Sequence, residues 1–396
     1  MTREYPIKKK EIQSILLNLI DNSDSIKTTF EDLYHFDTYK IQQDREEMKE
    51  FFNLLVIITN NHHRNPGFFN KISIIIEFFS KYIKQTFSNY EIFDIFKKSK
   101  PLLLILLNKK ILLFDEAISN LIVHMETISQ FNKNKKYEFH SQFFYPEIKN
   151  YISQFSEKKI REQLLLYDSN VFDNFNEKRL IGENESYLCE IIRKDLVEDF
   201  IIYVNKKNIS LSKTRIKVSI FETNLFLVTN KNPTIIEYTA FFGSIQIFQY
   251  LLLNNVELTS SLWIYSIHGN NPDMIHILEE NKVELKDYKI YLFECIKCHH
   301  NDIANYIKNN FINENLEKTS INDIYQYSSL YGNVLADNLL NCAFHYFNYE
   351  FLPNFFVFNK IYLFYICKYN HLKLFELILN TGDYHLNITL IYNQVN

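Results

Sequence analysis

The second half of the chain repeats itself, and this repetition restricts the fold more than any other feature of the sequence. The segment 236–258 (IEYTAFFGSIQIFQYLLLNNVEL) aligns without a gap to 263–285 (WIYSIHGNNPDMIHILEENKVEL), 27 residues later. Periods of about 20 to 50 residues are typical of folds that stack one small unit many times. A single unit cannot bury its apolar face alone, so neighbouring units must share a core. We therefore expect a stack of similar units.

One turn position recurs in these units. With Gly243 as the reference, the equivalent positions are Asp195, Gly243, Asn270, His299, Gly332 and Asn370. Gly, Asn, Asp and His tolerate a positive φ best, as a tight turn between two antiparallel helices requires. Four residues before the turn the side chain is mostly small, which lets neighbouring helices approach closely. These residues are Ile191, Thr239, Ser266, Cys295, Ser328 and Ile366.

Apolar residues recur on both sides of the turn. Seven residues before it stand Leu188, Ile236, Trp263, Leu292, Tyr325 and Leu363, and eight residues after it stand Tyr203, Leu251, Leu278, Ile307, Leu340 and Ile378. Each unit is thus predicted to be a pair of helices with one apolar face. Trp263 is predicted to belong to the core, because it occupies an apolar column. A long insertion, at about 205–232, follows the first turn.

The repeat resembles a known pattern. The segment 234–258 is similar to the ankyrin repeat, T-P-L-H-x-A-A-x-x-G-H-x-x-I-V-x-x-L-L-x-x-G, through Thr234, Ala240, Gly243, Ile247, Leu251 and Leu252. It departs from the pattern at Pro233, which is one position early, at Glu237, which replaces the His, and at Asn255, which replaces the last Gly. The segment 363–382 matches the same pattern.

Longer stretches resemble one particular family. NPTIIEYTAFFGSIQIFQYL and GENESYLCEIIRKDLVEDFIIYVNK, together with the N-terminal NHHRNPGFFNKI, look like a large protozoan family of ankyrin proteins. That family carries a domain of unknown function that overlaps its first repeats. The resemblance implies an ankyrin fold and a binding role. It implies no catalytic residue, no cofactor and no particular partner.

The chain is expected to divide into three parts. Residues 1–167 are predicted to form an N-terminal helical region, because apolar residues recur there at helical spacing. Residues 168–185 are polar and are predicted to be a linker, and residues 186–396 are predicted to hold about six ankyrin-type repeats with irregular spacing. The predicted fold class is all-α: an ankyrin-like helical solenoid with an N-terminal helical region.

Composition narrows the classes of function. The formal net charge is −4, with 23% charged residues, which gives no sign of a nucleic-acid partner. The longest apolar run, 102–107, is too short to span a bilayer. The cysteines are odd in number, at five, and lack the spacing of a disulfide framework, which favours reduced thiols in an intracellular protein. We expect an intracellular protein, most simply a cytoplasmic one, without an integral membrane segment.

Enzyme motifs are missing from the sequence. The six glycines lack the separations of a phosphate-binding loop, a dinucleotide fingerprint or a nucleophile elbow, and no H-E-x-x-H occurs. The prediction is that the chain is not an enzyme and uses no cofactor.

The sharpest competing pattern involves cysteines. Cys295, Cys298 and His299 have the spacing of a c-type haem attachment site, but the repeat register places Cys295 at the small position and His299 at the turn. A zinc site formed by Cys295, Cys298, Cys342 and His345 is the alternative hypothesis, because tetrahedral zinc takes four such ligands. It would make the chain a metal-binding regulatory protein.

Adjacent histidines are not expected to make a metal site. His62-His63 and His299-His300 are neighbours in sequence. Neighbours on a helix point about 100° apart, so each pair is predicted to lie in solvent or at a turn.

The favoured function is that of a protein-interaction scaffold or adaptor for unidentified proteins. In the predicted stack, residues of the first helices near the turns would line a concave groove: Tyr238, Phe241, Phe242, Tyr265, His268 and Lys297. The connection tips Glu257, Thr259, Glu284 and Lys286 form a second set of partner-binding candidates. Membrane tethering through the lysine clusters 8–10, 97–100 and 133–136 is a weaker hypothesis.

Overall fold

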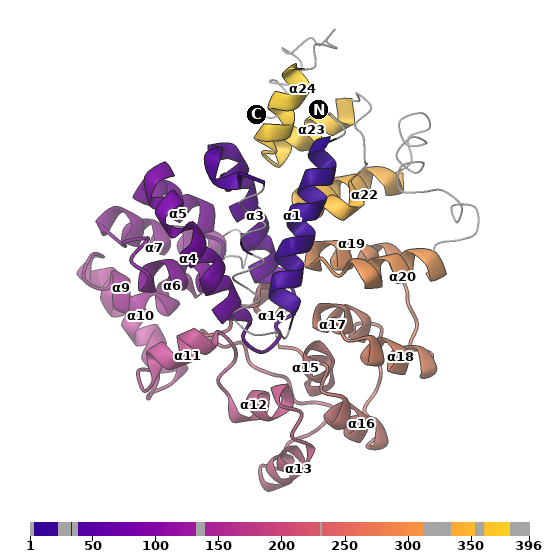
Figure 1. The fold of residues 1–396 in the computed structure, drawn as a ribbon. Helices are drawn as coiled ribbons and strands as arrows, with labels where there is room; N and C mark the ends of the chain where they lie inside the picture. Colours follow the sequence, from indigo (N-terminus) through magenta and orange to yellow (C-terminus); the bar gives the residue numbers. More distant parts are fainter. Residues whose placement is uncertain are drawn as a thin grey trace. The chain divides into compact units, whose positions relative to one another are not determined.

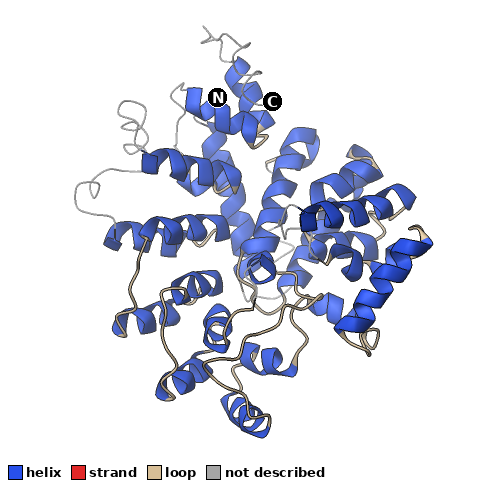
Figure 2. Ribbon diagram, turned by 180° about the vertical axis from the view of Figure 1, so that it is seen from behind, coloured by secondary structure: helices blue, strands red, loops and turns tan. Residues whose placement is uncertain are grey.

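The chain is helical wherever its structure is described. The computed structural model describes residues 4–22, 33, 39–131, 139–229, 232–311, 334–352 and 360–380. Figure 2 shows helices and connecting loops throughout these ranges. Within them, β structure is limited to one isolated antiparallel bridge between Arg215 and Thr234. The all-α prediction is confirmed.

The helices of the first half are short to medium in length (Figure 1). They are α1 (Glu4–Asp21), the 3-10 helix η1 (Ile41–Gln43), α3 (Arg45–Asn61), α4 (Phe68–Thr86), α5 (Asn89–Phe96), α6 (Lys100–Asn108), α7 (Glu116–Phe131), α8 (His140–Phe143), α9 (Tyr145–Ile148), α10 (Gln154–Tyr167) and α11 (Phe175–Ile181). The helix α11 lies inside the segment 168–185, which the sequence predicted to be a linker.

The second half continues with pairs of helices. They are α12 (Tyr187–Arg193), α13 (Val197–Lys206), α14 (Leu225–Thr229), α15 (Ile235–Phe242), α16 (Ile245–Leu253), α17 (Leu262–Gly269), α18 (Pro272–Glu280), α19 (Tyr288–Cys298), α20 (Asn301–Phe311), α22 (Val334–His345), the 3-10 helix η3 (Tyr349–Phe351), α23 (Lys360–Lys368) and α24 (Leu372–Asn380). No helix of the described ranges is both long and apolar enough to cross a membrane.

The chain forms two compact units. Unit 1 comprises Met1–Ile58, Arg64–Ile75 and Lys286–Asn396, and unit 2 comprises Thr59–His63 and Ile76–Leu285. Each unit therefore combines helices from the N-terminal region with helix pairs from the repeats.

Unit 2 contains three consecutive helix pairs. The helices α12 and α13, α15 and α16, and α17 and α18 pack as pairs (Figure 1). The first helices also contact one another in order, α12 with α15 and α15 with α17, and the second helix α13 contacts α16. Trp263 is 2% exposed and its indole Nε1 donates to the Val283 carbonyl at 3.1 Å. The predicted core role of Trp263 is confirmed.

Unit 1 contains the later pairs. The helices α19 and α20 pack as one pair and α23 and α24 as another. Between them, α22 contacts α19, α23 and η3. The N-terminal helix α1 lies against η3.

The predicted turn residues have the expected backbone conformation. The φ angles are +50° at Asp195, +64° at Gly243, +48° at Asn270, +60° at His299 and +61° at Asn370. The remaining candidate, Gly332, lies outside the described residues. Five of the six predicted positions thus adopt the left-handed conformation that ends a helix and starts a turn.

The turns share a hydrogen bond as well. The amide of the residue after the turn donates to the carbonyl four residues before the turn, as in a Schellman motif. The pairs are Leu196 to Ile191 (3.2 Å), Ser244 to Thr239 (3.1 Å), His300 to Cys295 (3.0 Å) and His371 to Ile366 (2.9 Å). The column of mostly small residues therefore supplies the carbonyl that closes each turn.

The register around α22 differs from the sequence prediction. This helix ends in a left-handed residue of its own, Phe347, with φ at +52°. The Asn348 amide donates to the Ala343 carbonyl at 3.0 Å, the same bond as at the other turns. The helix α22 is therefore followed by a turn at Phe347, as the first helix of a pair is, and Ala343 stands at the small position. Ser328 and Gly332 of the predicted unit lie outside the described residues, and that unit stays a prediction.

Candidate functional site

Five of the six candidate groove residues lie on α15 and α17 of unit 2, and most of these five are buried, whereas Lys297 lies on α19 of unit 1. The exposed fraction is 1% for Tyr238, 7% for Phe241 and Tyr265 and 0% for His268. Phe242 is half-buried. In this conformation these side chains do not form an open surface.

A helix from the long insertion covers them. Phe226 of α14 stacks on His268, with ring centroids 3.8 Å apart and a tilt of 23°, and is parallel to Phe241 at 6.0 Å. The Tyr265 ring meets Phe226 edge to face at 5.0 Å. The insertion at about 205–232 therefore places Phe226 of α14 against α15 and α17, the first helices of two helix pairs.

Polar contacts hold α14 in this place. The Asn224 Oδ1 accepts from the amides of Phe226 (3.0 Å) and Leu227 (3.3 Å), and so caps the helix. The Thr223 hydroxyl donates to the Gly182 carbonyl at 2.6 Å. Lys100, itself buried, donates to the Glu222 carbonyl at 3.1 Å. The α14 segment is therefore an integrated part of unit 2.

Tyr238 has a structural partner. The Arg193 Nη1 donates to the Tyr238 hydroxyl at 3.1 Å and to the Asn184 carbonyl at 2.7 Å, and its Nε pairs with Glu183 at 2.7 Å. Burial raises the pKa of Tyr238 well above its usual value, so the phenol stays neutral. The Arg193 guanidinium also lies 5.9 Å from the Phe242 ring centroid. These contacts join two neighbouring helix pairs.

The connection tips are the exposed members of the predicted set. Glu257, Thr259, Glu284 and Lys286 are all exposed. Lys297 is half-buried and pairs with Glu294 at 2.6 Å. Burial acts to lower the pKa of Lys297, but the Glu294 carboxylate outweighs it and raises the pKa to about 12. Lys297 therefore stays charged within this ion pair.

The four residues of the zinc hypothesis do not converge. Cys295 and Cys298 are fully buried and Cys342 is 8% exposed, whereas His345 is exposed and stacks on Tyr369 with centroids 4.7 Å apart. Across the described ranges, no group of three or more possible ligands with mutually close donor atoms contains more than one of the four.

The three thiols have buried surroundings. Burial raises the pKa of Cys295 and Cys298 well above the usual value and that of Cys342 to about 12. The Cys342 thiol donates to the Phe293 carbonyl at 3.5 Å. The packing roles predicted for Cys295 and His299 agree with this arrangement.

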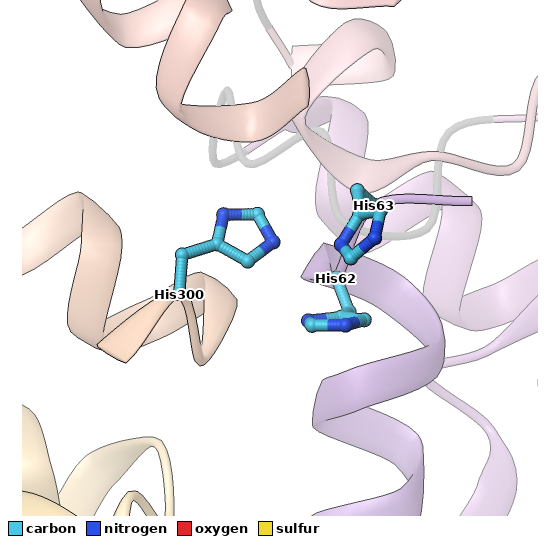
Figure 3. Close-up of side chains that lie close together, drawn as sticks. All are labelled: His62, His63 and His300. Atoms are coloured by element: carbon cyan, nitrogen blue, oxygen red, sulfur yellow. The ribbon is translucent and has the colours of Figure 1, made fainter. Parts of the chain in front are cut away.

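The pair His62-His63 differs from its prediction. The helix α3 ends at Asn61, so neither histidine is helical. Their rings lie 4.3 Å apart with a tilt of 52° (Figure 3). Contrary to the prediction, the two side chains are not neighbours on a helix, because α3 ends before them.

Sequence reasoning missed the residue that directly follows the turn in four of the helix pairs. In these pairs its side chain bonds to a backbone carbonyl of the preceding helix pair. The four bonds run from Ser244 Oγ to Ile192 O (2.5 Å), Asn271 Nδ2 to Gly243 O (3.4 Å), Asn348 Nδ2 to Ile296 O (2.9 Å) and His371 Nε2 to Phe344 O (2.9 Å). In three of them the acceptor stands three residues before the preceding turn. We call these four side chains the link residues.

The signal for the link residues was present in the sequence. The positions after the predicted turns hold Ser244, Asn271, His300 and His371, and all four are polar. Only Leu196, in the first pair, is apolar there. A further link starts at the first turn, where the Asp195 carboxylate accepts from the amides of Gln246 and Ile247, both at 3.0 Å.

In unit 1 the N-terminal helices bind the same turn region. The Gln13 Nε2 donates to the Asn348 Oδ1 at 3.1 Å, and the Tyr349 amide donates to the Gln13 Oε1 at 2.7 Å. From α3, the Glu50 carboxylate accepts from the Lys373 amide in the first turn of α24 at 3.2 Å. The helices α1 and α3 are therefore bonded to the last two repeat units.

Glu50 is the centre of a buried polar cluster in unit 1. It is 2% exposed, pairs with Lys9 at 2.7 Å and accepts from the Tyr5 hydroxyl at 2.7 Å. Burial acts to raise the pKa of Glu50, but the charge of Lys9 outweighs it and lowers the pKa. The Glu50 carboxylate therefore joins Tyr5 and Lys9 of α1 to the first turn of α24.

The comparisons with known proteins do not assign the chain to a family. No family model, no curated protein and no solved structure matches it.

Proposed function

We propose that this chain is an ankyrin-type helical solenoid that acts as a protein-interaction scaffold, as its resemblance to the protozoan ankyrin family implies. The observation that carries the proposal is the recurring bond made by the link residues. Stacked repeats need a fixed relation between each unit and its predecessor. Within each compact unit, the same position after the turn supplies that bond at successive helix pairs.

The exposed tips are the favoured binding surface. Connections between stacked units lie on one face and often carry the binding residues of repeat proteins. Glu257, Thr259 and Glu284 are exposed in the connections that follow α16 and α18. The first-helix residues are less suited to bind a partner directly, because Phe226 covers three of them. A partner would meet an acidic edge at Glu257 and Glu284.

A charge-reversal experiment tests this proposal. The double variant Glu257→Lys/Glu284→Lys changes both tips without touching a buried group. The variant Glu162→Lys is a matched control, because this side chain is 61% exposed on α10 of the same unit. Quantitative affinity purification should show proteins that the wild type and the control retain and that the double variant loses. If all three proteins recover the same set in equal amounts, the tips are not the binding surface.

A further inference from the structure

A surface hollow in unit 2 lies where α9, α10 and the turn before α11 meet. It has a volume of about 410 Å³ and is lined by Tyr145, Lys149, Asn150, Glu157, Arg161 and Phe172. Sites for small molecules typically have volumes of about 300 to 1,000 Å³. The hollow is therefore large enough for a ligand with one ring system and one charged group.

Two aromatic rings form one wall of the hollow. The ring centroids of Tyr145 and Phe172 are 5.9 Å apart with a tilt of 44°, and Phe172 is 41% exposed whereas Tyr145 is 7% exposed. The Tyr145 hydroxyl donates to the Glu157 carboxylate. Burial and this hydrogen bond raise the pKa of Tyr145 to about 12, so its ring stays uncharged. An exposed ring face can stack a flat unsaturated ligand.

Two cationic side chains, Lys149 and Arg161, also line the hollow. Lys149 and Arg161 are exposed, and neither has an ion-pair or hydrogen-bond partner among the described residues. Glu157 lies one turn before Arg161 on α10, yet its carboxylate binds the Tyr145 hydroxyl instead. Two cations against one engaged carboxylate leave an excess of positive charge that suits an anion.

We propose that this hollow binds a small aromatic phosphate of the nucleoside monophosphate type. The ring would lie on Phe172, the exposed member of the aromatic pair, and the phosphate would bind Arg161 and Lys149. A guanidinium binds phosphate oxygens in a bidentate manner, whereas an ammonium binds them as a point charge. The Asn150 amide offers both a donor and an acceptor for the polar edge of a base. This site is separate from the proposed interaction tips and does not depend on them.

Calorimetric titration of the full chain with three probes tests the proposal. The probes are adenosine monophosphate, adenosine and inorganic phosphate. The nucleotide should bind at least tenfold more tightly than either fragment, because only the nucleotide engages both the rings and the cations. The proposal is overturned if inorganic phosphate binds as tightly as the nucleotide, or if the nucleotide does not bind at millimolar concentration.

Variants separate the two halves of the site. Arg161→Gln and Lys149→Gln should each weaken nucleotide binding about tenfold and leave adenosine binding within about twofold. Phe172→Leu should weaken both ligands. Lys158→Gln, on the same helix with a side chain that is 78% exposed, is the matched control and should change neither. An equal loss in Lys158→Gln and Arg161→Gln would mean general charge attraction and would refute the site. Circular dichroism checks that each variant is folded.

Discussion

The link residue Asn348 allows the most quantitative test of the fold. It is fully buried, and its side chain makes three hydrogen bonds in unit 1. The amide donates to the Ile296 carbonyl at 2.9 Å and to the Asn301 Oδ1 at 2.8 Å, and its carbonyl accepts from Gln13 at 3.1 Å. We expect the change Asn348→Ala to destabilise the protein by loss of all three.

The magnitude follows from the partners that remain. A buried polar group without a partner costs about 1 to 3 kcal/mol, and such losses are not fully additive. The Gln13 Nε2 and the Asn301 Oδ1 each lose a hydrogen bond in this variant, whereas the Ile296 carbonyl still accepts from the His299 amide at 3.2 Å. We expect a loss of about 3 kcal/mol in the free energy of unfolding, near the upper end for single substitutions.

Equilibrium unfolding in urea, followed by circular dichroism, measures this loss. The matched control is Asn281→Ala, which removes an exposed side chain that donates to the Ile277 carbonyl of its own helix. The control should change the free energy of unfolding by no more than about 0.5 kcal/mol. Hydrogen exchange should place the loosening of Asn348→Ala in α1, α19 and η3. If Asn348→Ala is as stable as the control, the link residues do not stabilise the stack.

Four further outcomes are expected. Phe226→Ala should cost about 3 kcal/mol in urea unfolding because it empties the α14 contact, whereas Phe155→Ala, at 80% exposure, should cost little; equal losses would contradict the role of α14. Asn370→Ala should cost about 1 kcal/mol and Asn370→Gly almost nothing, because the residue is exposed at a φ of +61°; equal losses would contradict a backbone origin. A thiol reagent should modify Cys367 first in the native protein, since the other four cysteines are buried, and all five after unfolding; fast native reaction of several thiols would contradict this burial. Burial lowers the pKa of His371 against the opposing charge of Glu50. Its stabilising contribution is therefore present above the unfolded-state pKa of about 6.5 and is lost as the pH falls toward the lower folded-state pKa. His371→Gln should reduce the slope of the unfolding free energy against pH in this range, and an unchanged slope would contradict the assignment.

The turns were predictable because local chemistry determines them. Asp195, Gly243, Asn270, His299 and Asn370 are residue types that accept a positive φ, and each has one. Phe347 has the same conformation, but a phenylalanine carries no signal for it. The register of its unit could therefore not be read from the sequence, and the small residue Ala343 was overlooked.

Contacts between distant segments could not be derived from periodicity. Nothing in the insertion at about 205–232 indicates that Phe226 stacks on His268. The candidate groove residues were chosen from the repeat register alone. The register predicts which residues share one face of a helix, but it does not predict which other segment covers that face. The same holds for Gln13 and Glu50, whose partners lie more than 300 residues later in the chain.

For the cysteine pattern at 295–299, the repeat register predicted the environment of the residues better than the motif spacing did. The spacing of Cys295, Cys298 and His299 suggests a metal or haem site when read as a motif, but the repeat register assigns Cys295 a packing position and His299 a turn position. Full burial of both thiols and the φ of +60° at His299 agree with the register. A motif inside a repeat is therefore best interpreted after the repeat has been aligned.

Hydrogen exchange of the chain with and without a purified partner tests the scaffold proposal most directly. Binding at the tips predicts protection of the connections 254–261 and 281–287, which include Glu257 and Glu284, with unchanged exchange in α14. Protection that leaves both connections unchanged, or deprotection of α14 on binding, would contradict the proposal and indicate a different binding surface.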